Sequence, residues 1–225
     1  MKNIWITNVE TFNNTYNLGT EPLSVASNEH KQLLLSLIRE ERDELKEGIR
    51  SSDPVETLDA IADLLYVVIG CGVRLGLDLE KALFSKTQSS LEEEGINPWI
   101  SQISAFYRDS ELEGVCLKSS SEKQLNFYLS RLDHEITQLA VDLWQDCKDQ
   151  AIRVESTLAN LIWWLIRLST YLKLPIQEAF DAVQESNMSK LGEDGKPIYR
   201  HDGKLLKGPN FFKPDFSKLL ENYND

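Results

Sequence analysis

The sequence has little cysteine and little histidine, with three residues of each. Cys71, Cys116 and Cys147 form an odd, widely spaced set without a CxxC pair, which favours a reducing cytoplasm as the location of the chain. No histidine has a glutamate three positions before it, so the Glu-x-x-His ligands of a di-iron carboxylate bundle are missing. A di-iron bundle is therefore a weak alternative for this sequence.

Long hydrophobic runs are also missing. The longest apolar stretches, 64–73 and 158–168, carry or flank charged residues, and neither reaches the ~18 residues that a membrane span needs. The first 17 residues lack the apolar central region of a signal peptide. We therefore expect no membrane partner, and we expect both stretches to be buried helices.

Basic residues are scarce beside acidic ones, with 24 Lys and Arg against 36 Asp and Glu and a formal net charge of -12. Non-specific binding to nucleic-acid backbones draws on Lys and Arg to neutralise phosphates. We therefore expect no nucleic-acid polymer as a partner. An anionic substrate would need local positive charge, either from a metal ion or from a basic segment separate from the acidic parts of the chain.

Strand patterns of convincing length are missing too, which indicates an all-α fold. Apolar residues instead recur at helical spacing in the segments 29–48, 55–75, 79–91, 125–149, 152–174 and 175–183. Gly48 is expected to end the first helix, and Asp53 followed by Pro54 is expected to begin the second. We expect a short helix within residues 1–28 to pack as a cover.

Two of the expected helices carry rows of carboxylates. The first row consists of Glu40, Glu41 and Glu44, and the second of Glu56, Asp59 and Asp63. The short turn between the helices lets the rows face one another, and apposed carboxylates repel unless protons or cations lie between them. We therefore predict a Mg²⁺ site, with Mn²⁺ as a second possibility. A glutamate row alone is more often a solvated face, but Asp59 and Asp63 stand among apolar residues, where an unpaired carboxylate is costly to bury.

The chain also contains an internal repeat. Residues 62–83 align with residues 159–180 without a gap, at an offset of 97. Two such copies would form an internal pseudo-dimer of helical repeats, with further homodimerisation left open. We expect repeat one at residues 1–95, a connection at 96–121 and a degenerate repeat two at 122–225.

The two copies differ in their charged residues. The second copy replaces Asp63 by Asn160, Asp59 by Ser156 and Glu56 by Arg153, so it cannot hold the same metal ions. Only the second copy continues into a Gly- and Lys-rich tail, which carries Asn187, Lys190, Lys196, Arg200, Lys204 and Lys207. Flexible cations suit polyphosphate oxygens, and an asparagine can read a base or sugar edge. The alternative is a solvated tail, but the complementarity of the copies predicts one composite site per chain.

These motifs resemble the all-α nucleoside triphosphate pyrophosphohydrolases, which include the MazG-like, dimeric dUTPase-like and phosphoribosyl-ATP pyrophosphohydrolase-like proteins. The resemblance rests on Glu40-Glu41-x-x-Glu44, on the segment 59–79 and on the tail 186–210. It implies that the helix motifs matched by Glu40, Glu41 and Glu44 and by Asp63 bind Mg²⁺, and that the tail lies over a nucleotide. It also implies hydrolysis of a nucleoside triphosphate to the monophosphate and pyrophosphate, with non-canonical nucleotides and dUTP among the candidates.

The sequence departs from the family pattern at one ligand. The family's Glu three positions before Asp63 falls on Ala60, so either Asp59 or Glu56 is expected to replace it. We expect Glu40 to act as the general base, and Lys190, Lys196 and Arg200 to stabilise the leaving group. The alternative function is a non-catalytic helical module that binds nucleotides or a protein partner.

Overall fold

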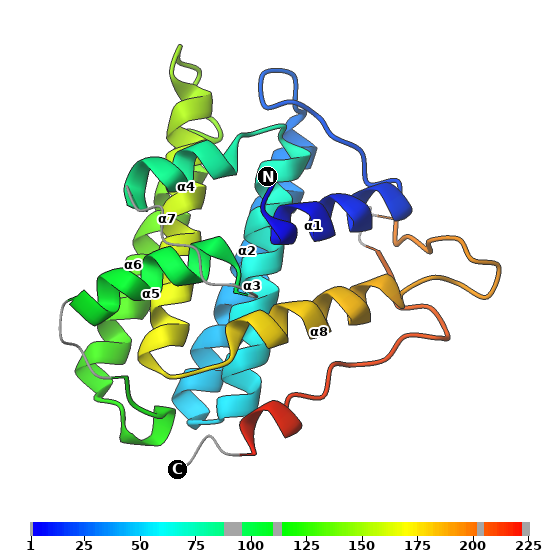
Figure 1. Ribbon diagram of the computed structural model, residues 1–225. Helices are drawn as coiled ribbons and strands as arrows, with labels where there is room; N and C mark the ends of the chain where they lie inside the picture. The colour runs from blue at the N-terminus through cyan, green and yellow to red at the C-terminus, as the bar shows by residue number, and fades with distance from the viewer. Residues whose placement is uncertain (1, 88–95, 110–113, 202–204, 222–225) are drawn as a thin grey trace.

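The computed structural model describes residues 2–87, 96–109, 114–201 and 205–221. These residues form an all-helical protein, which confirms the predicted fold class (Figure 1). The helices of the first half are α1 (Ile4–Thr15), α2 (Asn28–Ser51), α3 (Pro54–Arg74) and α4 (Leu79–Thr87). Those of the second half are α5 (Pro98–Asp109), α6 (Glu122–Asp142), α7 (Gln150–Tyr171) and α8 (Ile176–Met188). Two short 3₁₀ helices, Leu117–Ser119 and Lys218–Leu220, complete the described elements.

Helices α2 and α3 form an antiparallel hairpin joined by a very short turn. Asp53 caps α3 by accepting hydrogen bonds from the backbone N–H groups of Val55 (2.9 Å) and Glu56 (3.2 Å), and Pro54 takes the first helical position, as predicted. Gly48 does not end α2, which continues to Ser51. A Cβ at Gly48 would lie 2.9 Å from the backbone N of Thr57. Glycine at this position therefore serves the close approach of the two helices that carry the carboxylate rows.

Helices α6 and α7 form a second hairpin, which packs on the first through contacts of α3 with α7 and of α2 with α6. Asp133 of α6 pairs with Arg42 of α2 and lies 2.9 Å from Nζ of Lys46. The outer helices are exchanged between the halves, since α4 packs on α7 whereas α8 packs on α3. Figure 1 shows α1 and α8 on one side of this bundle and α4 and α5 on the other. Reciprocal packing of this kind is what a pseudo-dimer of the two halves would show, and the pseudo-dimer stays a prediction.

The segment 96–121, predicted as a connection, contains helix α5. The side chains of Asn3 and Asn97 cap α1 and α5, accepting hydrogen bonds from the backbone N–H groups of Trp5 (2.9 Å) and Trp99 (3.0 Å). The two asparagines also donate to one another, at 2.9 and 3.0 Å. Helix α5 thus occupies in the second half the place that α1 occupies in the first.

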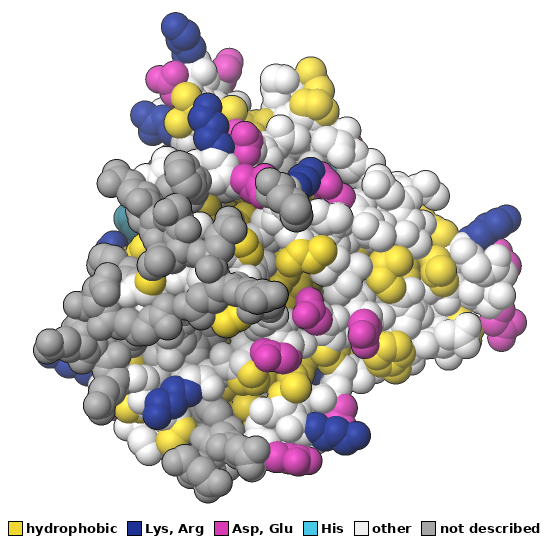
Figure 2. Space-filling view, viewed as in Figure 1, with side chains coloured by type: hydrophobic (Ala, Val, Ile, Leu, Met, Phe, Trp, Pro, Cys, Tyr) yellow, Lys and Arg dark blue, Asp and Glu magenta, His cyan; other side chains and the backbone are white. Residues whose placement is uncertain are grey.

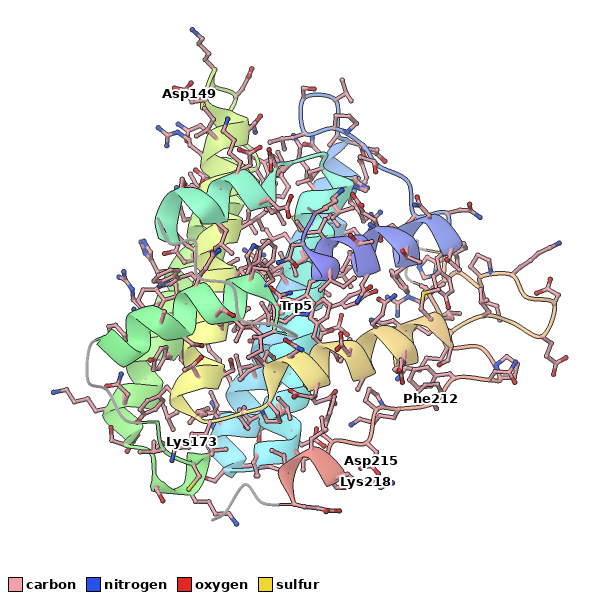
Figure 3. The ribbon with its side chains drawn as sticks, in the orientation of Figure 1. Trp5, Asp149, Lys173, Phe212, Asp215 and Lys218 are labelled. Atoms are coloured by element: carbon pink, nitrogen blue, oxygen red, sulfur yellow. The ribbon has the colours of Figure 1, made fainter. Side chains whose placement is uncertain are left out.

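Aromatic side chains fill the centre of the core. Trp5 is fully buried, stacks on Phe180 with ring centroids 4.6 Å apart, and meets the edge of Trp99 at 6.2 Å. Figure 3 labels Trp5 at the centre of the molecule, where it belongs to the core. None of the helices in the described ranges has both the length and the apolar composition to cross a membrane.

Candidate functional site

The two predicted carboxylate rows meet at one cavity of about 320 Å³. Helix α2 contributes Glu40, Glu41 and Glu44, and α3 contributes Asp59 and Asp63. These side chains lie at helical spacing on the facing sides of the hairpin, as their positions in the sequence predict. Glu56 lies outside the cavity wall and is exposed. Of the two candidates for the ligand missing at Ala60, the structure therefore brings Asp59 into the cavity.

The opposite wall of the same cavity comes from the second half of the chain. It contains the predicted residues Asn187, Lys190 and Lys207, together with Ser186, Phe211 and Lys213. The tail after α8 leaves the bundle and returns beside α8, as Figure 3 shows from the labelled Phe212 to Asp215 and Lys218. The cavity is therefore composite, with acidic groups from one half and basic groups from the other.

Several contacts hold the tail in place at this wall. Ser186 donates a hydrogen bond to the backbone oxygen of Phe212 (2.8 Å), and the Phe212 N–H donates to Ser189 (3.2 Å). The Gly208 N–H donates to the backbone oxygen of Lys190 (3.1 Å), where a Cβ on Gly208 would lie 1.9 Å from the backbone oxygen of Leu191. Only glycine allows this crossing, which brings Lys207 and the residues that follow back to the carboxylates.

Asn187 and Lys190 are fixed at the end of α8. Asn187 is buried, and its backbone oxygen accepts a hydrogen bond from the Tyr16 hydroxyl at 2.9 Å. The Lys190 ammonium donates to the side-chain oxygen of Asn187. These contacts point both side chains toward the cavity, where an ammonium group can bind a phosphate oxygen.

The remaining predicted tail residues lie elsewhere. Lys196 and Arg200 are exposed in an outer hairpin, held by a hydrogen bond from the Leu206 N–H to the Ile198 oxygen (2.8 Å), and neither lines the cavity. Lys204 falls outside the described residues. The prediction that Lys196 and Arg200 stabilise the leaving group is not supported by their positions.

Lys213 is a site residue that the sequence interpretation missed. Its Nζ lies 3.2 Å from Oδ2 of Asp59 and 3.7 Å from Oε1 of Glu56. Hydrogen bonding to Asp59, followed by the charges of Asp59, Glu56 and Asp63, raises the pKa of Lys213. A lone lysine between Phe212 and Pro214 has no spacing that links it to α3, so only the returning path of the tail could have revealed it.

The carboxylates influence one another strongly. Burial, followed by the negative charges of Asp59 and Glu44, raises the pKa of Asp63 to about 7, although Lys190 and Lys213 act in the opposite direction. Such a shift is expected where acidic groups face one another in a space with little water. Perturbed carboxyl groups in a cavity are typical of functional sites.

The donor set fits a hard divalent cation, because five carboxylates line one cavity and oxygen is the ligand that Mg²⁺ prefers. The side chains are not arranged around an ion, however: within the described ranges no three Asp, Glu, His or Cys residues are placed to hold one together. Lys213 instead lies against Asp59. Metal binding therefore requires the carboxylates to turn toward a common point.

A second cavity of about 170 Å³ adjoins the first and shares five wall residues with it: Glu41, Asp63, Asn187, Lys190 and Leu205. Its remaining wall is mostly apolar, formed by Phe12, Leu18, Leu33, Leu37, Tyr66, Val67 and Arg74. The two spaces together reach the size range of small-molecule sites, roughly 300–1,000 Å³. One ligand could therefore place a charged group in the cavity with the carboxylates and an apolar group in the second cavity.

Comparison with known proteins finds a family similarity in the first part of the chain. The family model described as phosphoribosyl-ATP pyrophosphohydrolase matches residues 12–89, which hold both carboxylate helices. The matched family belongs to the MazG-like all-α nucleoside triphosphate pyrophosphohydrolase superfamily. The match supports a pyrophosphohydrolase activity in general.

Over a longer stretch, the chain is 26% identical to the uncharacterized protein L479 of Acanthamoeba polyphaga mimivirus. The alignment spans 231 residues and covers 84% of this chain and 83% of the viral protein. No solved structure matches the chain.

Proposed function

We propose that this protein is a Mg²⁺-dependent nucleoside triphosphate pyrophosphohydrolase with one composite active site per chain. The observation that carries the proposal is the single cavity in which carboxylates of α2 and α3 face the ammonium groups of the tail. A triphosphate with its metal ion needs both kinds of group, since the carboxylates hold the cation and the lysines bind phosphate oxygens.

Glu41, Glu44, Asp59 and Asp63 are the residues that would hold Mg²⁺, or Mn²⁺ in its place. When bound, the ion would offset the charge of the triphosphate and make water a better nucleophile. Asp59 enters the set in place of the family's glutamate because it lines the cavity and Glu56 does not.

The chemical step is an in-line attack of water on the α-phosphorus. A new P–O bond forms to the water oxygen, the bond to the α–β bridging oxygen breaks, and pyrophosphate leaves with that oxygen. Glu40 lines the cavity beside Glu41 and would accept the proton of the attacking water. Lys190, Lys207 and Lys213 would stabilise charge on the leaving pyrophosphate, taking the role that the sequence interpretation gave to Lys196 and Arg200.

The proposal is tested by incubating the purified chain with Mg²⁺ and a panel of NTPs and dNTPs that includes dUTP, and resolving the products by chromatography. Monophosphate and pyrophosphate in equal amounts are expected from at least one nucleotide. Asp63→Asn and Glu44→Gln should abolish turnover. Glu47→Gln is the matched control, because Glu47 lies on α2 outside the cavity and pairs with Arg50 at 2.7 Å.

Release of single phosphates would contradict the proposal. If no nucleotide is turned over and calorimetry finds no saturable Mg²⁺ or Mn²⁺ binding, with or without nucleotide, the non-catalytic helical module is the better description.

A further inference from the structure

Arg74 is the one charged residue in the otherwise mostly apolar wall that the second cavity does not share with the first. Asp63, Val67 and Arg74 follow one another on the same face of α3, at spacings of four and seven residues. The eleven residues from Asp63 to Arg74 span roughly 16 Å along the helix axis at about 1.5 Å per residue. Arg74 therefore lies at the far end of the space that begins at the carboxylates.

Arg74 is only partly satisfied by its surroundings. Its Nη2 lies 3.3 Å from Nδ1 of His30, whereas its Nε is buried and has no hydrogen-bond partner among the residues that the structure describes. Burial lowers the pKa of Arg74, and burial together with Arg74 lowers the pKa of His30. A buried N–H group without an acceptor is costly, so a hydrogen bond from this guanidinium to an oxygen atom of a ligand would be favourable.

The fold itself does not require an arginine at this place. The offset of 97 that relates α3 to α7 puts Tyr171 at the position of Arg74 and Trp164 at that of Val67. In the second half this region is filled, with the Arg131 guanidinium 4.9 Å from the Trp164 ring centroid and Phe127 against the edge of that ring at 5.8 Å. Arg74 is thus a feature of the half that carries the carboxylates.

The orientation of a bound nucleotide follows from the two ends of this space. The triphosphate binds at the carboxylates, so the base extends into the apolar cavity with its sugar-bearing edge toward the carboxylates and its opposite edge toward Arg74. The atom furthest from the sugar is then the substituent at C4 of a pyrimidine or C6 of a purine. A guanidinium only donates hydrogen bonds. It can therefore donate to an oxo oxygen at this position, whereas an amino group there would find no acceptor.

We propose that Arg74 is a specificity-determining residue that selects nucleotides with an oxo group at this far edge, such as those of uracil and hypoxanthine, over their amino counterparts. This inference rests on the proposed function, because it takes the triphosphate to lie at the carboxylates. It goes further by assigning the substrate class to one side chain.

The test compares kcat/KM for two pairs of substrates that differ at the position in question, dUTP against dCTP and dITP against dATP. The wild-type protein should prefer the oxo member of each pair by about 10-fold or more, the range for a hydrogen bond to a charged group. Arg74→Met should reduce the preference in both pairs to about threefold or less, mainly because kcat/KM for the oxo substrates falls. Arg50→Met is the matched control, because Arg50 is exposed and pairs with Glu47, and it should leave both ratios unchanged.

Two further measurements test the role of Arg74 if the four nucleotides are not hydrolysed or if the Arg74→Met variant does not fold. If the protein hydrolyses none of these four nucleotides, the wider nucleotide panel decides the proposed reaction, and calorimetry with α,β-imido-dUTP and α,β-imido-dCTP tests Arg74 alone. Tighter binding of the uracil analogue supports its role, whereas equal binding or none overturns it. If Arg74→Met does not fold, Arg74→Gln replaces it, and the wild-type ratios still decide. Equal kcat/KM within both wild-type pairs, or an unchanged ratio in the folded variant, would overturn the inference.

Discussion

Nδ2 of Asn160 donates a hydrogen bond to Oε2 of Glu135 at 2.8 Å, joining α7 to α6. Offsets of 97 and 94 residues relate this pair to Asp63 and Glu41, the carboxylates shared by the two cavities of the first half. Beside it, Asp142 accepts hydrogen bonds from Gln138 and Thr157, both at 2.9 Å. The buried carboxylates Glu135 and Asp142 of the second half are thus paired with amide or hydroxyl groups, whereas in the first half the charges of Asp59 and Glu44 help to raise the pKa of Asp63.

The pairing predicts a structural role for Asn160. Glu135 is 6% exposed, so Asn160→Ala would leave a buried carboxylate without its amide donor and destabilise the protein by about 1–3 kcal/mol. Urea unfolding followed by circular dichroism measures this. Turnover per folded molecule should not change, and a loss of turnover at unchanged stability would show that the Asn160–Glu135 pair itself takes part in catalysis.

Asp63→Asn should recreate this amide–carboxylate pairing in the first half. We expect turnover to fall by about 100-fold or more, since even indirect partners of a metal ligand cost 10–100-fold. Stability without metal should rise at pH 8, because the substitution removes a carboxylate whose ionisation the fold opposes. A variant with wild-type activity would remove Asp63 from the site.

The pKa of Asp63 also predicts how stability depends on pH. The folded protein holds this proton up to about pH 7, whereas the unfolded chain releases it near 3.8. Stability from this group is therefore fully present below about pH 4 and is lost as the pH rises through 7, by about 1–3 kcal/mol after allowance for solvent. Thermal unfolding in EDTA from pH 5 to 8.5 should show the loss. Mg²⁺ should reverse it, and Asp63→Asn should not show it.

Lys213 competes with a metal ion for Asp59. Lys213→Met should tighten Mn²⁺ binding several-fold without nucleotide, because it removes a positive charge 3.2 Å from a ligand. It should lower kcat/KM by about 10-fold, because one donor to the phosphates is lost. Lys218→Met, an exposed change in the same tail, is the control. Weaker Mn²⁺ binding in Lys213→Met would show that the lysine supports the metal site.

Much of the site could be predicted from residue spacing. Glu41 and Asp63 meet because helical periodicity places them on facing sides of a hairpin. Only the second copy continues into a tail, and this difference between the copies predicted that Asn187 and Lys190 would lie beside them. The helix at 98–109 was missed, although Asn97, Trp99 and Ile100 repeat Asn3, Trp5 and Ile6 at an offset of 94. The match is short and precedes the longer repeat, so it stands out only once the reciprocal caps are seen.

Lys213 and Arg74 lay beyond sequence reasoning for a different reason. Lys213 contacts Asp59 of α3, and Arg74 lines a cavity to which Leu205 of the tail also contributes. Such contacts depend on the path of an irregular segment, which no periodicity describes. The sequence interpretation placed Lys196 and Arg200 at the leaving group for the same reason, whereas the path of this segment puts them in an outer hairpin.

The fate of the water oxygen is the most direct test of the proposed reaction at the composite site. Turnover of the preferred nucleotide with Mg²⁺ in ¹⁸O-labelled water, followed by mass spectrometry of both products, shows which phosphorus is attacked. The composite site predicts one ¹⁸O atom in the nucleoside monophosphate and none in pyrophosphate. Label in pyrophosphate, or in free phosphate released without pyrophosphate, would contradict it.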